Sequence, residues 1–96
     1  MELELSNRIF EWDDDKAEKN KIKHGVNFEK AIKVFDDKFR VERYDELHSD
    51  NEDRWITIGK VDDILFVVYT ERGYNTRIIS ARKADKDERR EYYGNR

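Results

Sequence analysis

The spacing of apolar residues changes character part-way along this chain of 96 residues. Apolar side chains recur at Phe28, Ala31, Ile32 and Phe35, which is the i, i+3, i+4, i+7 spacing of an amphipathic helix. From residue 39 onwards the apolar period becomes two, as it does in a half-buried strand. The pattern therefore predicts helices in the first part of the chain and a sheet in the second.

Residues that are typical of helix termini predict two helices before the sheet. Asp13 or Asp14 caps a helix over residues 16–24, because a short acidic side chain satisfies the first free backbone N–H groups. Gly25 ends this helix, since glycine adopts the left-handed conformation of a helix C-terminus at little cost. Asn27 caps the second helix in the same way as the first.

Four strands are predicted to follow one another along the chain. They cover residues 39–44, 54–61, 64–71 and 75–82. The third strand is nearly all apolar, which favours a central place in the sheet. The turns after the second and third strands are short, so the strands should pair antiparallel as a meander.

A capping box formed by Asp85 and Glu88 predicts a last helix that runs to about Tyr93. The element order predicts an α+β fold with two N-terminal helices, a four-stranded antiparallel meander sheet and a C-terminal helix. Residues 1–8 are interpreted as a flexible N-terminal tail and residues 9–96 as a single domain.

Composition excludes several classes of protein. The chain has no cysteine, which excludes disulfides, thiolate zinc sites and a cysteine nucleophile. The aromatic content of 12% argues against disorder. No secretory signal is recognisable at the N-terminus, and the longest apolar run, residues 64–69, is too short to span a membrane. We therefore expect a cytoplasmic protein without a membrane partner.

Charge is distributed unevenly along the chain. The net charge is −3, yet residues 72–96 contain eight Lys or Arg against four Asp or Glu. This asymmetry indicates an anionic partner for the basic segment, above all for the arginines between Arg72 and Arg82. A solvated helix with alternating charges explains residues 83–96 equally well.

Several motifs together resemble the BrnT family of bacterial toxins over roughly residues 9–93. They are FEWD (10–13), KHGV (23–26), FE (28–29), VFDD (34–37), HSD (48–50), EDRW (52–55), ITIG (56–59), VVYTERG (67–73), RIISAR (77–82) and ERREY (88–92). The resemblance implies a RelE-like fold and the toxin component of a type II toxin–antitoxin pair. It also implies an endoribonuclease that cleaves RNA and inhibits translation.

The resemblance implies further partners. A cognate antitoxin, expected to be a ribbon-helix-helix DNA-binding protein, would neutralise the toxin, and operator DNA would be contacted only through that antitoxin. RelE-like toxins are often basic, whereas this chain is acidic. This difference shifts the expected RNA affinity to a local basic site.

RNA cleavage without a metal ion or another cofactor is the chemistry that the residues suggest. His24 and His48 lack the spacing of metal ligands. In metal-independent cleavage the 2′-OH attacks its own phosphate, and the protein moves protons and stabilises negative charge. Arginine suits the second task because its planar guanidinium pairs with two phosphate oxygens. The candidates are Arg54, Arg72, Arg77 and Arg82, each of which could instead be a surface residue or part of a structural ion pair.

Parity raises a geometric difficulty for two of these arginines. Positions 77 and 82 differ by an odd number, so a regular strand would direct Arg77 and Arg82 to opposite faces. They share one site only if a bulge intervenes or Arg82 lies beyond the strand end.

Proton transfer has several candidates. Histidine is the residue type suited to proton transfer near neutral pH, so His24 is one candidate, although it could equally cap its helix. Lys23 could bind phosphate, act as an acid or remain solvated. Glu71 could act as a base or hold a neighbouring arginine. His48 is interpreted as a residue of a polar loop. The candidate catalytic set is thus Lys23, His24, Arg54, Glu71, Arg72, Arg77 and Arg82.

Lys21, Lys83 and Tyr92 are candidate RNA-binding residues, with Tyr92 either stacking on a base or anchoring its helix to the sheet. A second hypothesis is a weakly active or inactive toxin-like module that binds the antitoxin and tunes its DNA binding. The acidic net charge and the lack of a decisive acid–base pair motivate it. An independent DNA-binding protein is disfavoured because no basic recognition helix is present.

Overall fold

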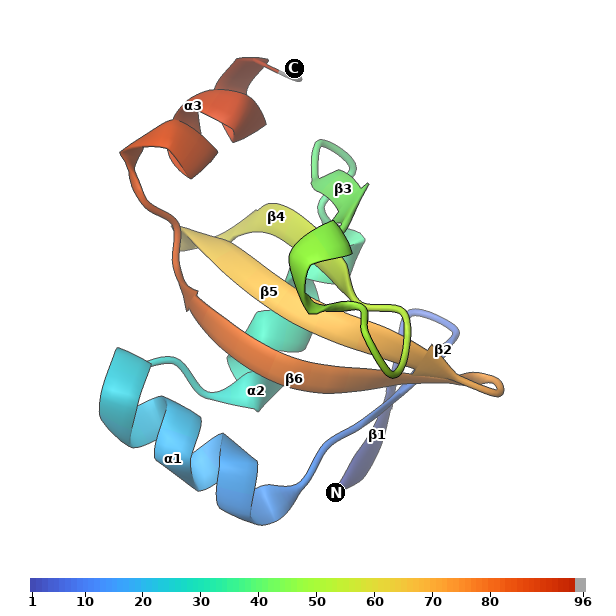
Figure 1. Cartoon of the computed structure of the whole chain (residues 1–96). Helices are drawn as coiled ribbons and strands as arrows, with labels where there is room; N and C mark the ends of the chain where they lie inside the picture. Colours follow the sequence, from blue (N-terminus) through green and yellow to red (C-terminus); the bar gives the residue numbers. More distant parts are fainter. Residues whose placement is uncertain (95–96) are drawn as a thin grey trace.

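The computed structural model describes residues 1–94 and contains a six-stranded mixed sheet with three α-helices (Figure 1). The strands are β1 (Glu2–Leu5), β2 (Arg8–Glu11), β3 (Val41–Tyr44), β4 (Trp55–Val61), β5 (Asp63–Arg72) and β6 (Asn75–Lys83). The helices are α1 (Asp14–His24), α2 (Phe28–Ala31) and α3 (Lys86–Gly94), and two 3-10 turns are η1 (Ile32–Asp36) and η2 (Glu46–His48). The spatial order of the strands is β1-β2-β6-β5-β4-β3.

The antiparallel meander predicted from the short turns is confirmed for β3 to β6. The apolar strand β5 pairs with β4 on one side and β6 on the other, so its central place is also confirmed. Asp62 and Gly73 have positive φ angles of 63° and 60°, which allow the chain to reverse within one or two residues. The local turn chemistry therefore sets the register of these strands.

The N-terminal residues depart from the expectation of a flexible tail. Glu2–Leu5 forms the edge strand β1, which pairs antiparallel with β2. Ser6 and Asn7 make the turn with φ angles of 55° and 64°. β2 then runs parallel to β6, so the sheet is mixed and has six strands rather than four. The alternation of Glu and Leu in β1 was a sequence signal for this strand, but four residues are too few to distinguish it from a tail.

The second helix is shorter than its periodicity suggested. The predicted cap is confirmed, because the Asn27 side chain accepts a hydrogen bond from the backbone N–H of Lys30 at 2.7 Å. After one α-helical turn, however, the chain continues as the 3-10 turn η1. Val34 of η1 packs so closely on β4 that a Cβ atom added at Gly59 would lie 2.9 Å from the Val34 Cβ. Only glycine permits this approach.

The two faces of the sheet carry different partners (Figure 1). One face, which we call the α2 face, bears Leu65, Val67 and Tyr69 of β5 and packs against α1, α2 and η1. The opposite face, which we call the α3 face, bears Phe66 and Val68 and packs against α3. The loop that contains η2 also crosses the α3 face, in front of β5 in Figure 1. None of the helices within residues 1–94 is long and apolar enough to cross a membrane.

Helix α1 lies beside the part of β6 that no strand covers. β2 pairs with β6 only at residues 75–77. Beyond them, the buried Asn20 side chain donates to the Ala81 carbonyl at 2.8 Å and accepts from the Ala81 N–H at 3.1 Å. Asn20 thus takes the place of a neighbouring strand and satisfies the backbone of β6. The predicted ends of α1, an Asp13 cap and a left-handed Gly25, are both confirmed.

Candidate functional site

A cleft of about 420 Å³ opens on the α3 face of the sheet. Its floor is apolar, its rim is cationic, and the η2 loop closes one side. The floor consists of Ile56, Phe66 and Val68; the cations of the rim are Arg43, Arg54 and Arg82, and His48 lies beside them. We call this feature the arginine cleft. An apolar floor with converging cations is suited to an anionic organic ligand.

A β-bulge decides which arginines reach this face. Val68 pairs with Ser80 and Tyr69 with Ile78, so Ile79 is an extra residue in β6. The slip places Arg77 and Arg82 on the same face, because their partners Thr70 and Phe66 share one face of β5. Of the two conditions under which Arg77 and Arg82 could share a face, a bulge or a strand that ends before Arg82, the structure contains the bulge.

Arg82 lies in the wall of the cleft with its charge compensated. Its guanidinium donates two hydrogen bonds to Glu88, at 2.7 and 2.8 Å, and lies 4.0 Å from the Phe66 ring centroid. These hydrogen bonds to the Glu88 carboxylate raise the pKa of Arg82 above its usual value. Glu88 also accepts from the backbone N–H of Asp85, which completes the predicted capping box. Arg82 thus fixes α3 against the sheet.

Replacement of Glu88 by glutamine is expected to lower the free energy of unfolding by about 1–3 kcal/mol, because it leaves the partly buried Arg82 without a charged acceptor. Urea unfolding followed by circular dichroism measures the change. Glu91→Gln, on the same helix and in a more exposed pair with Arg43, is the matched control and should lose less. Equal losses in the two variants would contradict the role given to Arg82.

Arg54 differs from the other arginines of the cleft. Its backbone is fixed, since its N–H donates to the Ser49 hydroxyl at 2.9 Å and its carbonyl accepts from the Asp45 N–H at 2.9 Å. Within residues 1–94, however, its side chain forms no ion pair. By contrast, Arg43 lies 3.5 Å from Glu91. Arg54 therefore has a guanidinium without a carboxylate partner among the described residues, while hydrogen bonds fix its backbone.

His48 lies at the rim with a carboxylate behind it. Its Nδ1 atom is 3.0 Å and 3.2 Å from the two carboxylate oxygens of Asp45, which is 8% exposed. The pair forms because residues three apart lie on one side of a 3-10 turn. The carboxylate can hold the proton on Nδ1, so that Nε2 is left to accept or donate a proton. This pair was not predicted from the sequence, although the spacing Asp-x-x-His was its signal.

Comparisons with known proteins agree with this fold. The family described as "Ribonuclease toxin, BrnT, of type II toxin-antitoxin system" matches residues 12–88. This chain belongs to the BrnT family. The resemblance that the sequence motifs suggested is thereby confirmed, and type II membership implies an antitoxin partner.

A solved member of the BrnT family has a similar structure. The crystal structure of the Brucella abortus ribonuclease toxin BrnT matches with a TM-score of 0.59 and 25% sequence identity. The match covers 78% of this chain and 94% of that one. No curated protein matches the chain.

The other candidate residues predicted from the sequence lie outside the arginine cleft. Arg72 lies 3.1 Å from Glu52 at the β5–β6 turn, and Lys83 lies 3.5 Å from Asp63. Lys21 lines a different hollow, together with Trp12 and Glu18. The cleft therefore collects two residues of the predicted catalytic set, Arg54 and Arg82.

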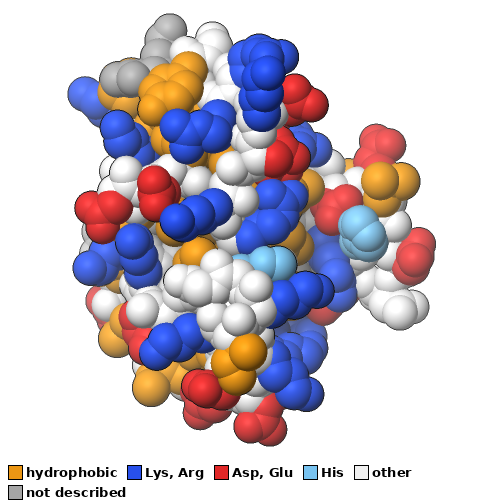
Figure 2. Space-filling view, turned by 90° about the vertical axis from the view of Figure 1, so that its left-hand side faces the viewer, with side chains coloured by type: hydrophobic (Ala, Val, Ile, Leu, Met, Phe, Trp, Pro, Cys, Tyr) orange, Lys and Arg blue, Asp and Glu red, His pale blue; other side chains and the backbone are white. Residues whose placement is uncertain are grey.

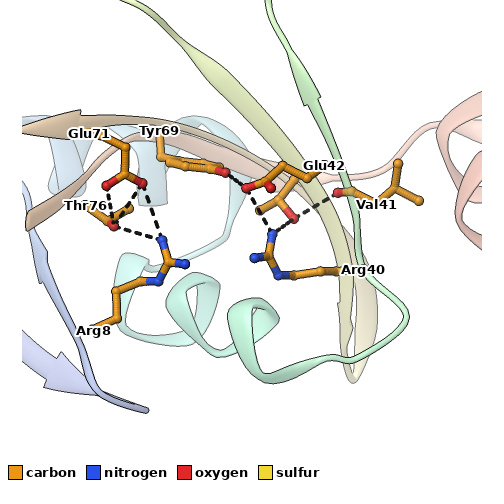
Figure 3. A network of polar contacts seen from close by, with 8 residues as sticks. Arg8, Arg40, Val41, Glu42, Tyr69, Glu71 and Thr76 are labelled. Atoms are coloured by element: carbon orange, nitrogen blue, oxygen red, sulfur yellow. Dashed lines mark hydrogen bonds and ion pairs between the residues drawn. The ribbon is translucent and has the colours of Figure 1, made fainter.

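Glu71 lies on the α2 face, on the opposite side of the sheet from the cleft. It accepts a hydrogen bond from the Thr76 hydroxyl and lies 3.4 Å from Arg8 (Figure 3). Arg40 and Glu42 form a second pair nearby, and the Glu42 carboxylate accepts from the Tyr69 hydroxyl. Glu71 thus connects β2, β5 and β6, and the second group connects β3 to β5.

Tyr92 is a core residue. Its side chain is 2% exposed, packs with Ile56, Ile58 and Ile64, and donates a hydrogen bond to Asp37 at 2.6 Å. The ring is therefore not available for stacking on a base. Of the two roles that the sequence allowed, the structure places Tyr92 in the one that anchors α3 to the sheet.

Arg77 pairs with Glu11 across the parallel strands β2 and β6, at 2.7 Å. Hydrogen bonds from Asn75 and then Arg77 lower the pKa of Glu11 below its ordinary value of 4.5. A lowered folded-state pKa stabilises the protein above the unfolded value, and this stabilisation is lost as the pH falls through the folded value. We therefore expect stability to decline below about pH 4.5, and the decline to be shallower in Glu11→Gln. Urea unfolding between pH 3 and 7 measures it, and identical slopes would contradict this account.

Proposed function

We propose that this protein is a metal-independent endoribonuclease toxin that cleaves RNA at the arginine cleft and thereby inhibits translation. The observation that carries the proposal is that one cleft is lined both by Arg54, whose guanidinium forms no ion pair within residues 1–94, and by the His48–Asp45 pair. A cognate antitoxin, a ribbon-helix-helix DNA-binding protein, would neutralise the toxin. Operator DNA would then be reached only through the antitoxin.

The residues of the cleft supply the three requirements of phosphodiester cleavage. His48 Nε2 removes the proton from the 2′-OH, and the 2′-oxygen attacks the adjacent phosphorus. Arg54 donates hydrogen bonds to the non-bridging oxygens as negative charge develops on them. The bond from phosphorus to the 5′-oxygen breaks, and this oxygen takes the proton held by the imidazolium. The products are a 2′,3′-cyclic phosphate and a 5′-hydroxyl end.

Asp45 acts through His48. Its buried carboxylate fixes the ring orientation and stabilises the imidazolium that forms when the proton is taken up. Its own backbone is held by the carbonyl of Arg54 and by the Ser49 hydroxyl. The base and the phosphate-binding arginine are therefore joined by one set of backbone hydrogen bonds, which keeps their separation constant.

Expression without an antitoxin tests the proposal. Growth should stop, and the purified protein should cleave RNA in the presence of EDTA to leave cyclic phosphate ends. Folded protein that leaves RNA intact over hours would overturn it.

The carboxylates of α3 favour a second candidate. Glu88 and Glu91 compensate Arg82 and Arg43, which lowers the positive charge of the cleft. A weakly active or inactive toxin-like module would work mainly by binding the antitoxin and tuning its DNA binding. Folded protein that binds its antitoxin tightly but does not cleave RNA would establish this alternative.

A further inference from the structure

A second cationic hollow adjoins the arginine cleft. It has a volume of about 230 Å³ and lies between α1 and β6. Its cationic lining residues are Lys16, Lys19 and Lys23, and the rest are Asn20, His24, Ile79 and Ser80. We call it the lysine hollow. Ser80 also lines the arginine cleft, so the two hollows meet at this residue.

Charge is segregated around α1. Lys16, Lys19 and Lys23 have the i, i+3, i+7 spacing of one helix face, and this face borders the lysine hollow. The carboxylates Asp14 and Glu18 line a different hollow, beside Trp12. Within residues 1–94 none of the three lysines forms an ion pair. Their charge is therefore available to an anion, unlike that of most arginines of the sheet.

The bulge in β6 brings the two hollows together. β2 pairs with β6 no further than Arg77, and α1 takes its place through the Asn20 side chain. Ile79, the extra residue, contributes to the lysine hollow alone, and Ser80 contributes to both hollows. Figure 2 shows Lys and Arg side chains gathered along this side of the molecule from α3 to α1.

We propose that the lysine hollow is a second phosphate subsite, which holds the backbone of single-stranded RNA beyond the scissile phosphate. The inference rests on the proposed function. RNA carries one negative charge per nucleotide. An RNA chain that is bound in the arginine cleft and continues past Ser80 would therefore bring a further phosphate to the lysine hollow. No aromatic side chain is among the lining residues of the hollow, so it is suited to the backbone rather than to a base. Lys23 and His24 then hold substrate and do not move protons.

Binding to RNA that cannot be cleaved tests the subsite. A fully 2′-O-methylated decanucleotide and a 2′-O-methylated dinucleotide, which has one phosphate, are compared by fluorescence anisotropy and competition. The double variant Lys19→Ala/Lys23→Ala should bind the decanucleotide about tenfold more weakly, and its salt slope should fall by about 0.7 for each phosphate that the protein no longer neutralises. Binding of the dinucleotide should be unchanged.

Lys33→Ala/Lys60→Ala is the matched control, because both side chains are exposed and line neither hollow. It should bind both oligonucleotides as the wild type does. The proposal is overturned if the Lys19/Lys23 variant binds the decanucleotide like this control. It is equally overturned if the variant loses dinucleotide binding to the same degree, or loses affinity for the antitoxin but not for RNA.

The subsite and the proposed function can fail separately. Wild-type protein that shows the expected length-dependent binding but never cleaves unmodified RNA would refute the endoribonuclease and support the subsite. Cleavage with wild-type affinity in the Lys19/Lys23 variant would refute the subsite and support the endoribonuclease.

Discussion

Replacing Arg54 by alanine is expected to slow RNA cleavage by about 10²–10³-fold while the fold stays intact. The side chain is the one arginine of the cleft without an ion pair among the described residues, so no other group of the cleft offers the same free charge. The hydrogen bonds of Arg54 that hold the η2 loop come from its backbone, and alanine keeps them. Single-turnover cleavage of a labelled oligonucleotide measures the rate, and thermal unfolding verifies the fold.

Two further variants sharpen this test. Arg54→Lys retains the charge but loses the planar fork, so an intermediate rate is expected. Arg90→Ala removes an exposed arginine of α3 that pairs with Asp87, and its rate should stay within about twofold of the wild type. A folded Arg54→Ala protein that cleaves at the wild-type rate would show that the phosphate binds elsewhere.

Replacing His48 by glutamine is expected to lower the cleavage rate by about 10²–10⁴-fold. A general base must be unprotonated to accept the proton of the 2′-OH, so the rate of the wild type should depend on pH. The variant should lose this dependence on pH. Rates measured between pH 5 and 8 therefore test whether His48 acts as the base, in addition to how much the rate depends on it.

The neighbours of His48 provide the controls. Glu46→Gln alters an exposed residue of the same 3-10 turn and should leave the pH profile unchanged. Asp45→Asn should lower kcat by at least about tenfold with little change in KM, since it disturbs the ring and not the binding of phosphate. His24→Gln should weaken binding of long RNA but keep the wild-type pH profile. If His24→Gln, rather than His48→Gln, removed the pH dependence, the base would lie on α1.

The elements that depend on near neighbours could be predicted from the sequence. The Asp13 and Asn27 caps, the Gly25 terminus and the Asp85–Glu88 capping box each involve residues a few positions apart, and each is present. The meander also follows from short turns between apolar strands. These caps and turns involve residues close together in the chain, so their stability depends mainly on the amino acids of the same short segment.

Features that depend on distant partners could not be predicted in the same way. β1 is a short edge strand with a mostly exposed surface, and it forms because β2, which itself pairs with β6, provides its one neighbouring strand. The 3-10 turn η1 depends on the close approach of Val34 to Gly59. In both cases tertiary packing selects a conformation that the local pattern leaves open.

The amino-acid sequence alone specifies which kinds of residue could bind RNA phosphate, and its motifs identify the family. Which arginines remain free depends instead on the fold. Arg77 is neutralised by Glu11, 66 positions away, and Arg82 by Glu88 on α3, whereas Arg54 has no such partner among residues 1–94. This is so because Coulomb attraction depends on separation in space, and folding brings together charges that are remote in the chain. The arginines between residues 72 and 82 are therefore each paired with a carboxylate, whereas Arg54 and the lysines Lys16, Lys19 and Lys23 of α1 form no ion pair among the described residues.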